Sequence, residues 1–212
     1  MTALAAAAGG TPVLWLVSRA SGLILLLLFS VVMALGIATR TGARSRRWPR
    51  FAVAELHRTL SLFAVALLVL HVATAVLDPY VSIGWLATML PFTAHYETAA
   101  LGLGTLAVDI GGAVLITSLL RARLGLRTWR AVHYLAYLAW PAAFVHAIRA
   151  AAYDQHLWWV VLTEWASLGI VATAVIVRLL ARAQTDAAGP ASGREHAAGP
   201  EPMTHDPQPA RR

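Results

Sequence analysis

The sequence contains no cysteine and no lysine, and charged residues of either sign are scarce. The absence of cysteine excludes disulfides, iron–sulfur clusters, thiolate-bound zinc and covalently attached c-type haem within this chain. All 17 basic residues are arginine, so the formal net charge of +7 is fixed at any ordinary pH. Only 13% of the 212 residues are charged and 58% are hydrophobic, whereas about a quarter of the residues in a soluble domain are charged. This composition is that of a membrane protein, with lipid as its expected surroundings.

A strongly basic chain can also indicate nucleic-acid binding, but the positions of the arginines argue against that partner. Five arginines lie in the segment Arg40–Arg50 and four in Arg121–Arg130, whereas residues 78–97 contain none. Clusters of arginine in alternate short loops between apolar stretches are typical of the cytoplasmic side of a membrane protein. We therefore expect no nucleic-acid partner.

Five apolar stretches predict five transmembrane helices, at about residues 12–38, 51–77, 98–120, 129–150 and 157–180. A cleavable signal peptide is the alternative for the first stretch, although no basic residue precedes it. The expected fold class is all-α, an integral membrane bundle of five transmembrane helices with a disordered C-terminal tail. We expect a flexible N-terminus at 1–11, a transmembrane domain at 12–180 and a disordered cytoplasmic tail at 181–212, which is rich in Ala, Gly and Pro.

The arginine clusters also predict the orientation. The positive-inside rule places both basic loops and the C-terminus in the cytoplasm and the N-terminus outside, in the plasma membrane. The second and fourth helices then run in the same direction, from the inside to the outside. In the connection at 78–97, the apolar piece 81–91 is expected to lie in the membrane interface.

Two of the predicted helices each carry a pair of histidines. His57 and His71 are fourteen residues apart, which is about 21 Å along a helix and within about 40° of four whole turns. His133 and His146 are thirteen residues apart, which leaves them about 140° apart around an ideal helix. Pro141 lies between them and is expected to kink or rewind the helix.

Because the two helices run in the same direction, His57 lies level with His133 near the cytoplasmic side, and His71 lies level with His146 near the outer side. Ionisable groups at membrane depth are costly and often functional, and neutral imidazole is a good iron ligand. The sequence therefore predicts two b-type haems at two depths, each held by one of these pairs. The alternative is that each histidine only hydrogen-bonds to a neighbouring helix.

The segments around these histidines read ELHRTLSLFAVALLVLH and WRAVHYLAYLAWPAAFVH, and SRASGLILLLLF precedes them. Over residues 12–180 the chain resembles the transmembrane domain shared by ferric reductases and NADPH oxidases. The resemblance implies two b-type haems that pass electrons outward across the membrane. The six-helix members of that family have one helix more at the N-terminal side. No glycine-rich dinucleotide motif follows the fifth helix, so we expect no FAD or NAD(P) site and a separate flavoprotein or a quinol as electron donor.

The chain is also similar to the haem-bearing membrane subunit of the periplasmic methionine sulfoxide reductase system. The shared pattern is Trp-x-x-x-His-x-x-x-Tyr-Leu at Trp129, His133, Tyr137 and Leu138. In that family the position of His57 is not always histidine, so its presence here favours two haems. The sequence thus predicts a ferric reductase-like transmembrane di-haem cytochrome b. One alternative is a haem-bearing membrane anchor subunit of a larger redox system, and a remote one is a metal or proton transporter.

Five further polar residues are candidates for a role. Arg19 could pair with a propionate of the outer haem or attract an acceptor, and Arg58 could hold an inner propionate; the alternatives are contact with lipid headgroups and a plain positive-inside residue. Asp109 is expected to hydrogen-bond between helices, with proton relay as the alternative. His95 and His156, in the outer connections, could bind a metal ion but need have no special role.

Overall fold

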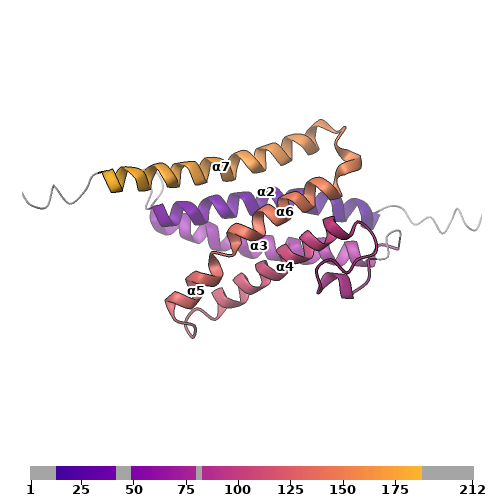
Figure 1. Cartoon of the computed structure of the whole chain (residues 1–212), viewed down its shortest axis with the longest axis horizontal. Coiled ribbons are helices and arrows are strands. Elements are labelled where there is room, and N and C mark those ends of the chain that lie inside the picture. Colours follow the sequence, from indigo (N-terminus) through magenta and orange to yellow (C-terminus); the bar gives the residue numbers. More distant parts are fainter. Residues whose placement is uncertain (1–12, 42–48, 80–82, 188–212) are drawn as a thin grey trace, which may run out of the picture.

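A computed structural model describes residues 13–41, 49–79 and 83–187 of the chain (Figure 1). Within these ranges every regular element is helical, and five helical stretches are long and apolar enough to cross a membrane. The all-α, five-span prediction is therefore confirmed. The elements are α2 (Val13–Thr41), α3 (Arg50–Leu77), η1 (Leu86–Thr88), α4 (Thr98–Leu119), α5 (Leu126–His133), α6 (Ala136–Ala150), η2 (Ala152–Asp154) and α7 (Trp158–Ala187).

Two boundaries depart from the sequence prediction. The fourth predicted span consists of two helices, α5 and α6, which Tyr134 and Leu135 separate. The last helix, α7, continues to Ala187, seven residues beyond its predicted end at Leu180. The N-terminal segment 1–11, the centre of the arginine-rich segment Arg40–Arg50 and residues 188–212 of the predicted tail lie outside the described residues.

The helices expose large apolar side chains along their length, as surfaces in contact with lipid do. On α3, for example, Leu62, Phe63 and Val69 are each more than half exposed. No water is available in the bilayer core to solvate a backbone, so a chain that crosses it must satisfy its backbone hydrogen bonds within helices, as these spans do. The protein is a multi-pass membrane protein, and its helices contact lipid.

The helix α2 is the centre of the bundle. It packs against α3, α6 and α7, while α4 packs against α6 (Figure 1). Its contacts with α3 are antiparallel, because His71 lies beside Ser18 and His57 beside Val32. Positions along α2 therefore measure depth for the helices around it.

A cluster of buried apolar side chains joins α2, α6 and α7. Met33, Ile37, Trp140 and Val171 form this cluster. The indole Nε1 of Trp140 donates to the Ser30 hydroxyl at 2.9 Å, and that hydroxyl donates to a carbonyl of its own helix. A buried indole N–H requires an acceptor, so Ser30 fixes the depth at which α6 packs on α2.

The bundle has two ends, which we name by one residue each. The Asp154 end carries the connection 83–97 and the turn 151–157. There Thr105 of α4 donates its hydroxyl to the Ala87 carbonyl at 2.7 Å, and Trp85 projects as an exposed apolar side chain. The Arg121 end carries the turn 120–125 and the beginnings of α3 and α5.

Candidate functional site

Three of the four predicted ligands make the same kind of contact, in which the ring nitrogen Nδ1 reaches a backbone carbonyl of a neighbouring helix. All four histidines are half-buried. The distances from Nδ1 to the carbonyl oxygen are 3.0 Å for His57 to Val32, 2.8 Å for His71 to Ser18 and 2.7 Å for His146 to Ala100. These contacts tie α3 to α2 at two depths and tie α6 to α4.

This contact determines which ring nitrogen is available for a metal. A carbonyl oxygen can only accept a hydrogen bond, so Nδ1 must carry the proton. The lone pair of the neutral ring then resides on Nε2, the nitrogen that commonly coordinates metals. Histidine ligands of metals typically donate their other ring N–H to a carbonyl or carboxylate in this way, which fixes the tautomer and the ring orientation.

The structure brings His71 and His146 together. Their ring centroids lie 6.3 Å apart with an interplanar angle of 78°, and their Nδ1 atoms bond to carbonyls on different helices, α2 and α4. An imidazole nitrogen binds a metal ion at about 2 Å, so two rings that share one ion have centroids roughly 6 Å apart. The observed separation would therefore allow both rings to bind one metal ion.

His133 lies at the opposite end of the same helical span, in a different setting. Its ring stacks on Trp129 at 4.9 Å, and the guanidinium carbon of Arg121 lies 4.6 Å from the Trp129 ring centroid. Trp140, seven residues further along, is level with Ser30 of α2, and His57 is level with Val32. His57 and His133 therefore both lie on the Arg121 side of the level of Trp140 and Ser30.

The helix is rewound beside His133 and not at Pro141, which lies inside the continuous helix α6. Around Tyr134 and Leu135, three backbone bonds span three residues instead of four: 135 to 132, 137 to 134 and 138 to 135, at 2.8–3.1 Å. A chain wound in this manner turns about 120° per residue, against about 100° in an α-helix. The tighter winding adds rotation in the direction that brings His146 toward the face of His133.

Arg19, predicted to lie near the outer haem, has a partner that sequence reasoning missed. Its Nε lies 2.5 Å from Asp154 Oδ2, and its guanidinium lies 4.7 Å from the Trp15 ring centroid. Among the described residues its Nη2 is buried without a hydrogen-bond partner. Arg19 directly follows Ser18, whose carbonyl accepts from His71, so Arg19 and the His71 anchor lie at the same end of α2.

Arg58, the other predicted arginine, lies at the Arg121 end. Its Nη1 is 3.7 Å from Glu55 on the same helix, and both side chains are well exposed. Its position directly after His57 keeps it near that ring, and its exposure leaves it free to turn toward another anion.

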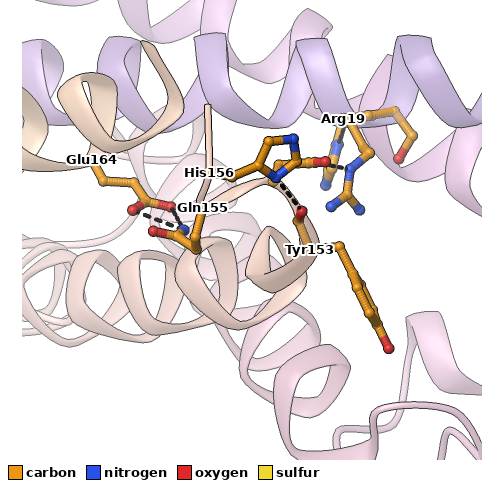
Figure 2. Close-up of polar contacts among 8 residues, drawn as sticks. Arg19, Tyr153, Gln155, His156 and Glu164 are labelled. Carbon is orange, nitrogen blue, oxygen red and sulfur yellow. Dashed lines mark hydrogen bonds and ion pairs between the residues drawn. The ribbon is translucent and has the colours of Figure 1, made fainter. Parts of the chain in front are cut away.

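A second carboxylate at the Asp154 end went unpredicted. Glu164 of α7 is buried, and the Gln155 side-chain amide donates to both of its oxygens at 2.9 and 3.1 Å (Figure 2). The signal was present in the sequence, because Glu164 is an acidic residue within the fifth apolar stretch. Asp154 and Gln155 are neighbours in one turn, so this turn ties both α2 and α7 to the helix that carries His146.

The remaining candidates lie on the surface. Asp109 is exposed on α4 and is not enclosed between helices of this chain. His95 and His156 are also exposed, and His156 Nδ1 donates to the Tyr153 carbonyl of its own turn at 2.9 Å (Figure 2). In the part of the chain that the structure describes, no group of three or more His, Asp or Glu side chains could hold a metal ion. That finding does not concern a haem site, because a haem iron needs only two histidine side chains from the protein.

A comparison with protein families bears on what these histidines do. The family model described as "Ferric reductase like transmembrane component" matches residues 21–144, which is more than half of the chain. The chain belongs to this family. No curated protein and no solved structure gives a significant match. Domains of the ferric reductase-like family generally bind haem, so this protein is a membrane redox component. The match contains His57, His71 and His133 and ends two residues before His146.

Proposed function

We propose that the protein is a transmembrane di-haem cytochrome b that carries electrons from a cytoplasmic donor to an acceptor on the outer side. The observation that carries this proposal is the His71–His146 pair, with rings 6.3 Å apart and each Nδ1 committed to a carbonyl. Two rings held in this way present two Nε2 lone pairs with little freedom to turn aside. The family membership supports haem as the group between them.

Each haem would be held by one histidine of α3 and one of the fourth span. His71 and His146 would bind the haem iron at the Asp154 end, and His57 and His133 would bind the haem iron at the Arg121 end. A bound haem iron supplies the one-electron chemistry, by alternating between its ferric and ferrous states. The domain proposed to bind both haems is residues 12–180, and the proposed cytoplasmic tail is 181–212.

The arginines would bind the haem propionates. Arg19 has a buried Nη2 without a partner among the described residues, and a guanidinium N–H forms strong, charge-assisted bonds to a carboxylate. Arg58 is exposed beside His57 and can turn its guanidinium toward a propionate of the other haem. Asp154, which is paired with Arg19 at 2.5 Å, would keep the Arg19 side chain in place.

The direction of transfer rests on the positive-inside rule. Four exposed arginines, at positions 121, 123, 127 and 130, lie around the turn before His133. By this rule we propose that the Arg121 end and the C-terminus lie in the cytoplasm, and that the N-terminus and the Asp154 end face outward from the plasma membrane. The donor is then a separate flavoprotein or a quinol on the cytoplasmic side, and the acceptor is ferric iron, oxygen or a partner protein outside.

A second candidate is a haem-bearing anchor subunit of a larger redox system, such as methionine sulfoxide reductase. The Trp129–His133 stack favours this second candidate. These two residues are the Trp and His of the shared Trp-x-x-x-His pattern, and their side chains are in contact. Under this reading the acceptor is always a partner protein. Reduction of free ferric chelates by the isolated, reduced protein would favour the first candidate over this one.

The haem content of histidine variants tests the proposed function. We expect two haems per chain in the wild type, one in His71→Ala and one in His57→Ala, because each substitution removes one ligand pair. His156→Ala is the matched control, since that ring is exposed and bonds only within its own turn; it should keep two. Two haems retained in His71→Ala would contradict the proposed pairing.

A further inference from the structure

The three carbonyls that anchor histidine rings share a feature, which is a glycine four residues further along the same helix. Fourteen residues separate the two such sites on α2, the same spacing as His57 and His71 on α3. The pairs of carbonyl and glycine are Ser18 with Gly22, Val32 with Gly36, and Ala100 with Gly104.

Helix geometry gives a reason for this spacing. In an α-helix the carbonyl of residue i points toward the C-terminus, where it accepts from the N–H of residue i+4. Side chains lean the opposite way, toward the N-terminus, so the side chain of residue i+4 covers the turn that contains this carbonyl. A ring from another helix can approach the carbonyl closely only where residue i+4 has no side chain.

The distances show how little room a side chain would have. A Cβ built at position 104 would lie 2.7 Å from His146 Nδ1, and one at position 22 would lie 2.9 Å from His71 Cε1. One at position 36 would lie 3.2 Å from His57 Cε1. Cβ atoms essentially never approach other atoms more closely than 3.0 Å, so at the first two positions the ring would have to move.

Close approach of two helix backbones does not explain these three glycines, because the atoms nearest to an added Cβ are imidazole atoms at all three. A Cβ at Gly111, Gly112 or Gly169 would meet no atom within 4 Å. Two of these lie on α4, the helix that also carries Gly104. Small residues let membrane helices approach each other, and at Gly22, Gly36 and Gly104 the group that approaches is the imidazole of the neighbouring helix.

The fourth position on this pattern is filled differently. Fourteen residues beyond Ala100 and Gly104, α4 has Val114 and Ser118. The Ser118 hydroxyl donates to the Val114 carbonyl at 2.7 Å and lies 3.4 Å from the indole Nε1 of Trp129, which donates to it. Trp129 in turn stacks on His133. At this position the helix contacts the ring-stacking tryptophan.

We propose that Gly22, Gly36 and Gly104 are positioning residues, each of which lets one imidazole reach a helix carbonyl and so fixes its tautomer and the direction of Nε2. The His71–His146 pair then has two such anchors, one on each side, while His133 is positioned through Trp129 and Ser118. This inference rests on the proposed function in one respect, that these rings are haem ligands.

Alanine substitutions on a single helix provide the test. Gly104→Ala displaces the His146 ring, and Gly111→Ala is the matched control on α4, where a methyl group meets open space. Loss of an orienting partner lowers the affinity of a metal site by about tenfold to a hundredfold. We expect Gly104→Ala to lose the haem at the Asp154 end, or to retain it with an altered low-spin electron paramagnetic resonance signal, and Gly111→Ala to match the wild type.

The distances also predict a graded series that stays informative if Gly104→Ala fails to fold. Gly22→Ala should perturb the signal of the same haem, and Gly36→Ala should perturb the other haem more weakly, because its contact is longer. If the spectra of the wild type and of Gly22→Ala, Gly36→Ala and Gly104→Ala were identical, the inference would be overturned. The proposal that the protein binds haem would be unaffected. A wild-type protein without haem would instead overturn the proposed function.

A measurement on the haem-free protein tests the tautomer directly. With 15N-labelled histidine, the wild type should show protonated Nδ1 and unprotonated Nε2 for the anchored rings, because a carbonyl can only accept. Gly104→Ala should shift the resonances of one ring, and Gly111→Ala should shift none. Equal spectra for both variants would contradict a positioning role, whatever the haem content of the protein.

Discussion

At the scale of single residues, the polar side chains at the Asp154 end link helices that are far apart in the sequence. Arg19 and Asp154 are 135 residues apart in the sequence, yet their side chains meet at 2.5 Å and are about a fifth exposed. Their contact joins α2 to the turn that follows α6, and α6 carries His146. The pair therefore links the helix that anchors His71 to the helix that holds the opposite ligand.

Asp154→Asn should lower the free energy of unfolding by about 1–3 kcal/mol, because it leaves a partly buried guanidinium without its carboxylate. Unfolding monitored in detergent measures the loss, and the double variant with Arg19→Gln gives the coupling energy of the pair. Glu55→Gln is the control, since the Glu55–Arg58 pair is well exposed and should change stability by less than about 0.5 kcal/mol. Equal losses for both pairs would contradict a structural role of the Arg19–Asp154 contact.

At the scale of secondary-structure elements, the interruption between α5 and α6 sets the rotation of His133 relative to His146. Sequence reasoning placed the correction at Pro141 because proline removes a backbone donor. The interruption lies instead at Tyr134 and Leu135, neither of which carries a helix-breaking signal. We ascribe the tight winding there to tertiary packing. Trp129, before the interruption, contacts Ser118 of α4, and Trp140, after it, contacts Ser30 of α2.

Two variants separate these explanations. Pro141→Ala restores a backbone N–H inside α6 and should leave both haems and their spectra unchanged. Insertion of one alanine between Tyr134 and Leu135 turns α6 by about 100° relative to α5, so one ligand of the fourth span should lose its partner and the haem content should fall to one. An effect of Pro141→Ala as large as that of the insertion would contradict our account, as would an insertion without effect.

The sequence was sufficient for the features that depend on composition and spacing. The number of spans follows from apolar length, and the common direction of α3 and the fourth span follows from that number. The anchoring carbonyls of Ser18, Val32 and Ala100 could not be predicted, because backbone groups have no residue-specific signal. The partners of Arg19 and Glu164 required knowledge of how the turn 151–157 folds back on α2 and α7.

At the scale of the whole molecule, the proposed direction of electron transfer depends on which end of the bundle faces the cytoplasm. Reporter fusions test this: alkaline phosphatase, which is active only outside the cytoplasm, and green fluorescent protein, which is fluorescent inside. Phosphatase fused after Leu90 should be active, and green fluorescent protein fused after Gly125 or after the C-terminus should be fluorescent. The reverse pattern would invert the direction of electron transfer while leaving the haem sites as proposed.

The most direct test of the central claim is a reduced-minus-oxidised visible spectrum of the purified protein, with haem counted per chain. Cells that express the chain should be supplied with haem, so that its absence cannot be ascribed to supply. Our account predicts the spectrum of low-spin b-type haem and two haems for each chain, one for each histidine pair. A colourless protein from these cells would contradict the electron-transfer function, and a single haem per chain would contradict the two-haem arrangement.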